Sequence, residues 1–145
     1  MNSYKLAQYS KWFILSFALF FSATNVRAQL SVTMSPIKVT GQKAIVQLKM
    51  KNNFNQNIES ARAACFLFDD QGKMVGQSAK WVIGGTKDKV PLAPAKETTF
   101  NFVITANHPF TTTNLTTKVQ FNQVLLKDGK LADITKDVQI QTVSK

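Results

Sequence analysis

Side chains that could act as a nucleophile, a base or a metal ligand are scarce in this chain. Cys65 is the only cysteine and His108 the only histidine among the 145 residues. A nucleophile needs an adjacent base, and no carboxylate lies within ten residues of His108 on either side. A zinc site needs several Cys or His ligands at defined spacing. We therefore predict no catalytic residue, no metal site, no cofactor, and a protein that is not an enzyme.

Cys65 lies between Ala64 and Phe66 in an apolar run, which is typical of a buried and unreactive thiol. A reactive thiol needs a nearby cation or a helix N-terminus to lower its pKa, and the adjacent residues provide neither. A single cysteine cannot form an internal disulfide, so the folded domain must depend on its hydrophobic core.

The acidic residues suggest turns rather than ion sites. Asp69 and Asp70 form the only adjacent pair of carboxylates. Such a pair could bind calcium weakly, but an aspartate that caps a turn is the favoured interpretation. Gly84 and Gly85 lack the remaining residues of a phosphate-binding loop, so a turn is expected there too.

The first residues have the pattern of a signal peptide. Lys5 and Lys11 precede an apolar run of 12 residues, 12–23, which is shorter than the roughly 20 residues that span a bilayer. Val26 and Ala28 are the small residues that signal peptidase recognises. We predict a signal peptide over residues 1–28, with an uncleaved anchor as the alternative.

Cleavage after Ala28 would leave a mature domain of residues 29–145, which is enough for one hydrophobic core. We expect it to be exported, periplasmic or extracellular, without a stable membrane span. Removing the leader takes three of the 18 basic residues and none of the 8 acidic ones, so the mature charge is +7. Scattered lysines favour solubility and allow an anionic cell-envelope partner; nucleic acid is not expected.

Apolar and polar residues alternate along most of the mature chain. In residues 44–50, for example, Ala44, Val46 and Leu48 lie on one face and Gln47 and Lys49 on the other, the period of a strand with one buried face. No stretch has the period of a long amphipathic helix. The seven predicted strands are 30–34, 44–50, 60–68, 73–83, 98–105, 117–126 and 137–143. They predict an all-β, immunoglobulin-like antiparallel β-sandwich, with a closed barrel as the alternative.

Residues 65–77 predict a β-hairpin. Asp69 and Gly72 fit the first and last positions of a type I turn, with Gly72 in the left-handed conformation. This turn pairs Phe68 with Met74. An uninterrupted register then continues along both strands.

That register assigns every hairpin residue to one of two faces. The predicted inner face carries Ala61, Ala63, Cys65, Leu67, Val75 and Trp81, with Trp81 as a core anchor. The predicted outer face is a candidate contact surface of aromatic, Met and Arg residues, which are enriched in protein interfaces. Its residues are Phe66, Phe68, Met74, Arg62 and Lys80, with Arg62 and Lys80 side by side.

The hairpin also resembles a known family. Leu67 and Asp69 match the FxLYD motif, Phe68 stands for its Tyr, Cys65 for its Phe, and Gly72 follows in the turn. FxLYD domains are immunoglobulin-like domains of exported prokaryotic proteins.

A second segment extends the likeness. Residues 92–100 resemble the family's later Leu-x-Pro-Gly segment, with Ala95 where Gly is usual, and the likeness covers roughly residues 43–104. The resemblance implies the fold and an exported location. It implies no reaction, because most of the family has no defined activity.

Two functions follow as hypotheses. We expect an exported, non-catalytic module that binds another macromolecule, a protein or an anionic envelope component, through a sheet face or end loops. The alternative is a small secreted hydrolase or ligand-binding enzyme whose site is assembled only in the folded chain.

Overall fold

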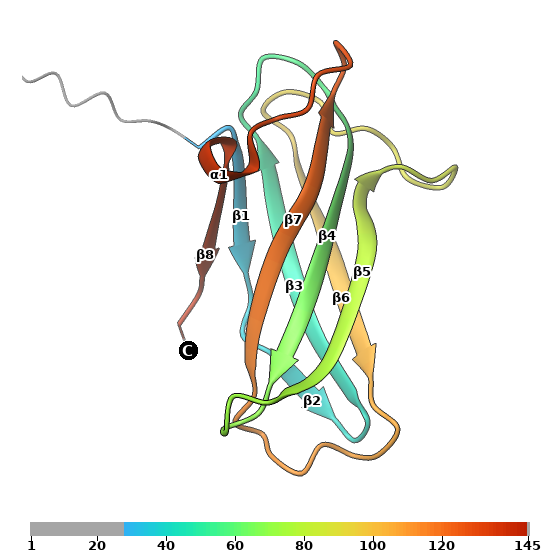
Figure 1. The fold of residues 1–145 in the computed structure, drawn as a ribbon. Coiled ribbons are helices and arrows are strands. Elements are labelled where there is room, and N and C mark those ends of the chain that lie inside the picture. Colours follow the sequence, from blue (N-terminus) through green and yellow to red (C-terminus); the bar gives the residue numbers. More distant parts are fainter. Residues whose placement is uncertain (1–27, 145) are drawn as a thin grey trace, which may run out of the picture.

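The chain folds as a β-sandwich of two sheets (Figure 1). The computed structural model describes residues 28–144, so the predicted leader, apart from Ala28, lies outside the described residues. The elements are β1 (Leu30–Met34), β2 (Lys38–Thr40), β3 (Lys43–Asn52), β4 (Ile58–Phe68), β5 (Met74–Gly84), β6 (Glu97–Thr105), β7 (Thr116–Leu126), α1 (Ile134–Asp137) and β8 (Val138–Thr142). All seven predicted strands are present; β2 and the one-turn helix α1 were not predicted.

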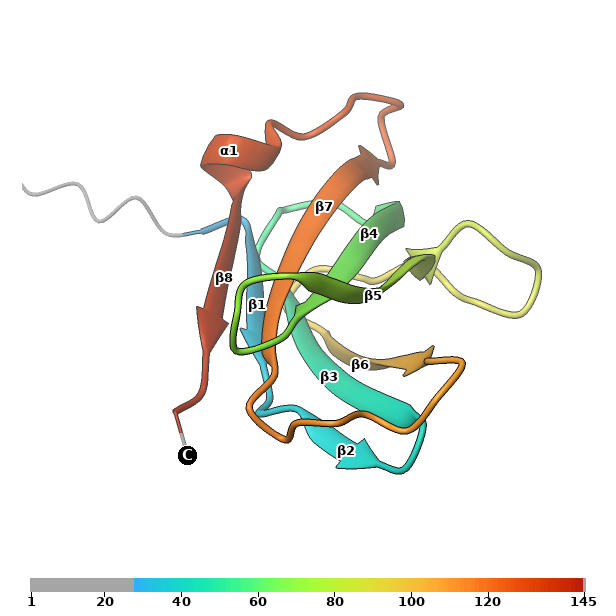
Figure 2. The same cartoon turned by 60° about the horizontal axis from the view of Figure 1, so that its bottom comes forward.

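The back sheet is built around β3. This strand pairs antiparallel with β6 along one edge and with β1 and β2 along the other. β1 also pairs in parallel with β8, the last strand of the chain. Figure 2 shows β8 beside β1 at the edge of this sheet.

The front sheet has three antiparallel strands in the order β5-β4-β7. β4 is central, so the backbone groups of most of its residues are engaged by a neighbour on each side. The loop of residues 85–96, which we call the β5–β6 loop, projects from the side of the sandwich (Figures 1 and 2).

The core lies between the two sheets and follows the alternation of the sequence. Ala44, Val46, Leu48 and Met50 of β3 are fully buried, as predicted. Cys65 is fully buried among them. Other core residues are Leu30, Val32, Ala61, Ala63, Leu67, Phe102, Ile104, Val119, Phe121 and Val124.

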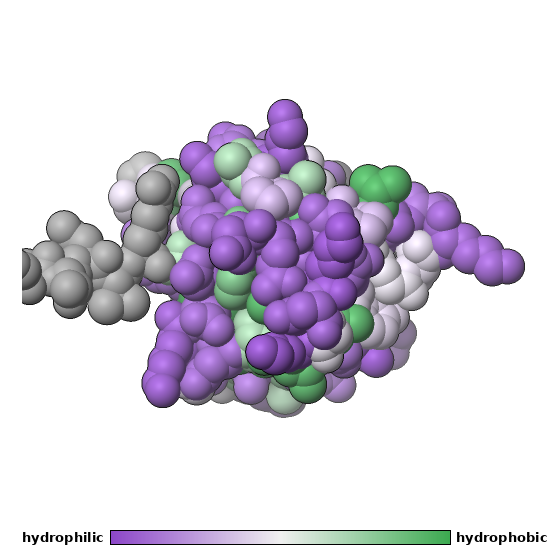
Figure 3. All heavy atoms as spheres, turned by 90° about the horizontal axis from the view of Figure 1, so that it is seen from above, coloured by the Kyte–Doolittle hydropathy of each residue, from purple (hydrophilic) through white to green (hydrophobic). Residues whose placement is uncertain are grey.

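The surface is mainly hydrophilic. Seen from the end that carries α1, polar residues dominate and hydrophobic ones are separated from each other (Figure 3). Among residues 28–144, no helix has the length and apolar character needed to cross a membrane.

The hairpin turn forms as predicted. Gly72 has φ +76° and donates its N–H to the Asp69 carbonyl at 3.1 Å. The Asp69 carboxylate accepts from the N–H groups of Gln71 and Lys73, at 3.0 and 2.8 Å. Asp69 therefore caps the turn with its side chain.

The predicted uninterrupted register is wrong. Phe68 pairs with Met74, but Leu67 then pairs with Gly76, which leaves Val75 as a β-bulge. An extra residue in one strand moves every later pair by one position. Gly76 consequently faces inward, where a Cβ atom would lie only 2.8 Å from Ile104 Cγ2 of β6.

Two assignments change as a result. Trp81 pairs with Arg62 on the outer face of the front sheet and is half-buried, so it is not the predicted core anchor. Lys80 pairs with the buried Ala63 and therefore leaves the sheet on the opposite side from Arg62. Lys80 stays exposed there because β5 is an edge strand, where a charged side chain discourages pairing with another chain.

Candidate binding site on the front sheet

The outer face of the front sheet contains an open hollow of about 700 Å³, which we call the front hollow. It is lined by Arg62, Ala64, Phe66, Gln77, Ser78, Ala79, Asn122 and Gln123. All three strands of the front sheet contribute. Phe66 and Gln77 belong to the hairpin 65–77, and Ser78 follows it directly.

Two small residues form the floor. Ala64 of β4 and Ala79 of β5 are directly paired across the strands. On either side along β4, the larger side chains of Phe66 and Arg62 rise above them. The hollow therefore exists because alanines occupy the middle row while larger residues occupy the rows beside it.

One end of the hollow is aromatic. Phe66 pairs with Gln77 on one side and with Lys118 on the other. Phe68 and Met74 form the next pair along these strands whose side chains point outward. Met74 is 49% exposed. Both phenylalanines are half-buried, so the structure brings Phe66, Phe68 and Met74 together on the outer face. That this face contacts a partner stays a prediction.

The other end presents a positioned cation. The guanidinium carbon of Arg62 lies 5.8 Å from the centroid of the Trp81 ring, within the range of a cation–π interaction. A Cβ atom on Gly85, which has φ +77°, would overlap the same indole ring. The loop backbone therefore packs on Trp81, which in turn supports Arg62.

One bulge places amide side chains at this end. Asn122 of β7 is unpaired between Phe121 and Gln123, next to Arg62. A bulge bends its strand and re-aims the side chains beside it. Asn122 and Gln123 are consecutive, yet both line the front hollow.

The charge around the hollow is positive. None of its lining side chains is acidic. Glu59 is the only acidic residue in β4, β5 and β7, whereas Arg62 lines the hollow and Lys118 extends the Phe66 row. Within residues 28–144, Arg62 takes part in none of the ion pairs, which join Lys49 to Glu97 and Lys136 to Asp133.

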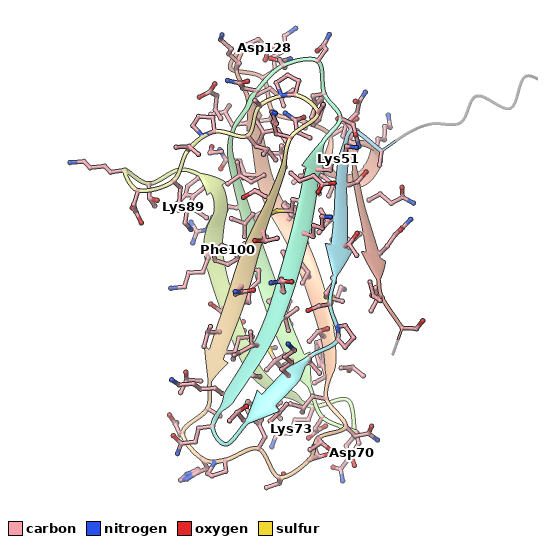
Figure 4. All side chains as sticks on the ribbon, turned by 180° about the vertical axis from the view of Figure 1, so that it is seen from behind. Lys51, Asp70, Lys73, Lys89, Phe100 and Asp128 are labelled. Carbon is pink, nitrogen blue, oxygen red and sulfur yellow. The ribbon has the colours of Figure 1, made fainter. Side chains whose placement is uncertain are left out.

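A second hollow of about 520 Å³ lies beneath the β5–β6 loop. Lys89 anchors this loop, because its Nζ donates to the carbonyl of Trp81 and lies 4.5 Å from the Phe100 ring centroid. Figure 4 shows Lys89 reaching from the loop toward Phe100 on β6. Sequence reasoning missed this contact, since nothing local to Lys89 distinguishes it from the other lysines.

The residues considered for catalysis do not come together in the described chain. Burial raises the pKa of the Cys65 thiol from 9.0 to about 11, so the thiol is protonated at neutral pH. His108 is exposed in the loop between β6 and β7. Within residues 28–144, no three His, Cys, Asp or Glu residues are grouped as metal ligands.

Sequence reasoning placed Phe66 and Arg62 on the correct face but missed Trp81, Asn122 and Gln123. For Trp81 the available signal was Gly76, because a glycine inside a strand often marks a bulge or a close backbone approach. Both apply here.

No family model matches the chain, and no curated protein matches it. One similar solved structure is the X-ray structure of a Northeast Structural Genomics Consortium target, at 9% identity and a TM-score of 0.41, covering 73% of this chain and 77% of that chain. Another is a β-glucuronidase from glycoside hydrolase family 2, at 16% identity and a TM-score of 0.41, covering 71% of this chain and 12% of that one.

Proposed function

We propose that the protein is an exported, non-catalytic module that binds another macromolecule on the outer face of its front sheet. The observation that carries this proposal is the front hollow, with Phe66 at one end and Arg62 supported by Trp81 at the other. Aromatic and arginine side chains are enriched at binding interfaces. Small floor residues between them leave space for a ligand.

Export is supported by the leader pattern of residues 1–28, which remains a prediction. The resemblance of residues 43–104 to FxLYD domains also remains a prediction, and it favours the same location. The fold is compatible with cleavage after Ala28, because β1 begins at Leu30, one residue after the new N-terminus at Gln29.

The alternative, a small secreted hydrolase or ligand-binding enzyme, requires an acid or base cluster in a hollow. The eight side chains that line the front hollow include no carboxylate, imidazole or thiol. The second hollow is lined by two carboxylates, Asp88 and Glu97, but Glu97 is already paired with Lys49 at 2.9 Å.

Binding by the front face can be tested with Phe66→Ser, using the exported protein to capture components of the host's own cell envelope. The matched control is Val103→Ser, because Val103 is an apolar residue that is 49% exposed on β6, in the other sheet. We expect each variant to lower the free energy of unfolding by about 1 kcal/mol or less. Capture should be lost only with Phe66→Ser. Capture that survives Phe66→Ser, or that falls equally in both variants, contradicts the proposal.

A further inference from the structure

We propose that the front hollow binds an acidic polysaccharide, a chain of sugar rings that carry carboxylates. This inference rests on the proposed function, because it names the ligand of the same face. It follows from four properties of the hollow: how its backbone is paired, its charge, its hydrogen-bonding side chains and its length.

Recognition in the front hollow has to use side chains. β4 forms the middle of the sheet and pairs with both β5 and β7, so the backbone groups of its floor are engaged in the two ladders. An extended peptide usually gains its backbone hydrogen bonds from a sheet edge, and the middle of a sheet face offers none. A ligand with many side groups and no peptide backbone suits this surface better.

The charge selects an anionic ligand. The Arg62 guanidinium has five N–H donors in a planar fork that matches a carboxylate. It is held at the Trp81 ring and takes part in none of the ion pairs within residues 28–144. Because the hollow contains no acidic side chain, a ligand carboxylate there would meet an attractive partner and no repulsive one.

The other polar side chains suit hydroxyl groups. Gln77, Asn122 and Gln123 line the hollow, and each amide both donates and accepts hydrogen bonds. A sugar hydroxyl also does both. The apolar C–H face of a sugar ring can lie on Phe66 and on the alanine floor. Polar groups of a ligand placed there would be left without hydrogen-bond partners.

The length favours a chain over a single sugar. Phe66 and Arg62 are four residues apart on β4, which corresponds to about 13 Å along an extended strand. Contact with both ends therefore requires more than one sugar ring. The hollow lies on an open sheet face, so a chain could continue past either end.

The back sheet also carries exposed lysines, on β2 and β3. Lys49 of β3 is already paired with Glu97 of β6 at 2.9 Å. That hydrogen bond is the main cause of the lowered pKa of the Glu97 carboxyl. The other exposed lysines of the back sheet, such as Lys43, provide a charge-matched control for Arg62.

The test is isothermal titration of the full exported protein with three probes: hexagalacturonate, neutral cellohexaose and poly-glutamate. We expect binding of hexagalacturonate and no comparable binding of the other two. Arg62→Gln should weaken it about tenfold or more, the usual effect of losing a charged hydrogen bond. Gln123→Ala should weaken it in the same direction, while Lys43→Gln, exposed on β3, should change it less than about twofold.

Several results would overturn the inference. Equal binding of cellohexaose rules out charge selection, and equal binding of poly-glutamate identifies an acidic peptide instead. An equal loss with Lys43→Gln identifies unspecific attraction to a basic protein. If no probe binds, the polysaccharide assignment fails; the capture experiment with Phe66→Ser then decides separately whether the front face binds anything. The melting temperature of each variant shows whether it is folded.

Discussion

The environment of Cys65 determines what its thiol can do. Its side chain is fully buried, and that burial raises its pKa to about 11. We expect no reaction of the folded protein with iodoacetamide at pH 8, and complete labelling once guanidinium unfolds it. Labelling of the folded protein, followed by mass spectrometry, would show that the strand opens locally.

The same pKa shift predicts how stability changes in alkali. An unfolded thiol ionises near pH 9, whereas the folded thiol stays protonated up to about pH 11. Its contribution to stability is therefore complete below pH 9 and is lost as pH rises from about 9 to about 11. Urea unfolding of the wild type and Cys65→Ala across this range should show a steeper decline for the wild type.

Two glycines with positive φ allow a matched comparison. Both Gly72 and Gly84 have positive φ, but a Cβ atom on Gly72 meets nothing within 4 Å, whereas one on Gly84 would overlap the backbone carbonyl of Glu59. Gly72→Ala should cost about 1 kcal/mol of unfolding free energy, the price of the left-handed conformation alone. Gly84→Ala should cost about 3 kcal/mol or more, because the backbone must also move. Similar losses in urea unfolding would show that the Glu59 carbonyl moves freely.

At the scale of elements, the alternation of the sequence was sufficient to predict seven strands and the sandwich. It also placed the β3 core residues, and the residue types of Asp69 and Gly72 placed the hairpin turn. Alternation counts residues along one strand, however, and a bulge depends on what the neighbouring strand and the opposite sheet allow. The bulge at Val75 turns Gly76 toward Ile104 of the other sheet, where a Cβ atom would lie only 2.8 Å from Ile104 Cγ2. Which β5 residues line the front hollow depended on that bulge.

The β5–β6 loop depends on one lysine. Lys89 is the only residue of this loop whose side chain is placed both at a β5 carbonyl and over a β6 ring. Lys89→Met should therefore leave the melting temperature nearly unchanged but make the loop easier to cut near Val90, which is exposed.

Subtilisin digestion followed by mass spectrometry measures this effect. Lys87→Met is the control, because Lys87 is exposed in the same loop. Equal rates of cleavage in the two variants would mean that Lys89 does not hold the loop in solution.

At the scale of the whole molecule, the predicted leader should be removed on export. Mass spectrometry of the protein from its native host should find Gln29 as the first residue. The fold tolerates this cut: Asn53 Nδ2 loses the Ala28 carbonyl but keeps Ser31 Oγ at 2.9 Å. Asn53 N–H also still donates to the Gln29 carbonyl. A different first residue, or an intact leader in the membrane fraction, would contradict the prediction.

The parallel pairing of β1 with β8 has a mechanical consequence. The two strands run side by side from Leu30 beside Val138 to Met34 beside Thr142, so the chain enters this pair at one end and leaves it at the other. A pulling force applied through the two ends of the chain would slide the strands past each other. All their hydrogen bonds would then carry the load together, instead of breaking one after another as in a peeled hairpin. A domain stretched between two attachment points in an envelope would resist extension at this pair of strands.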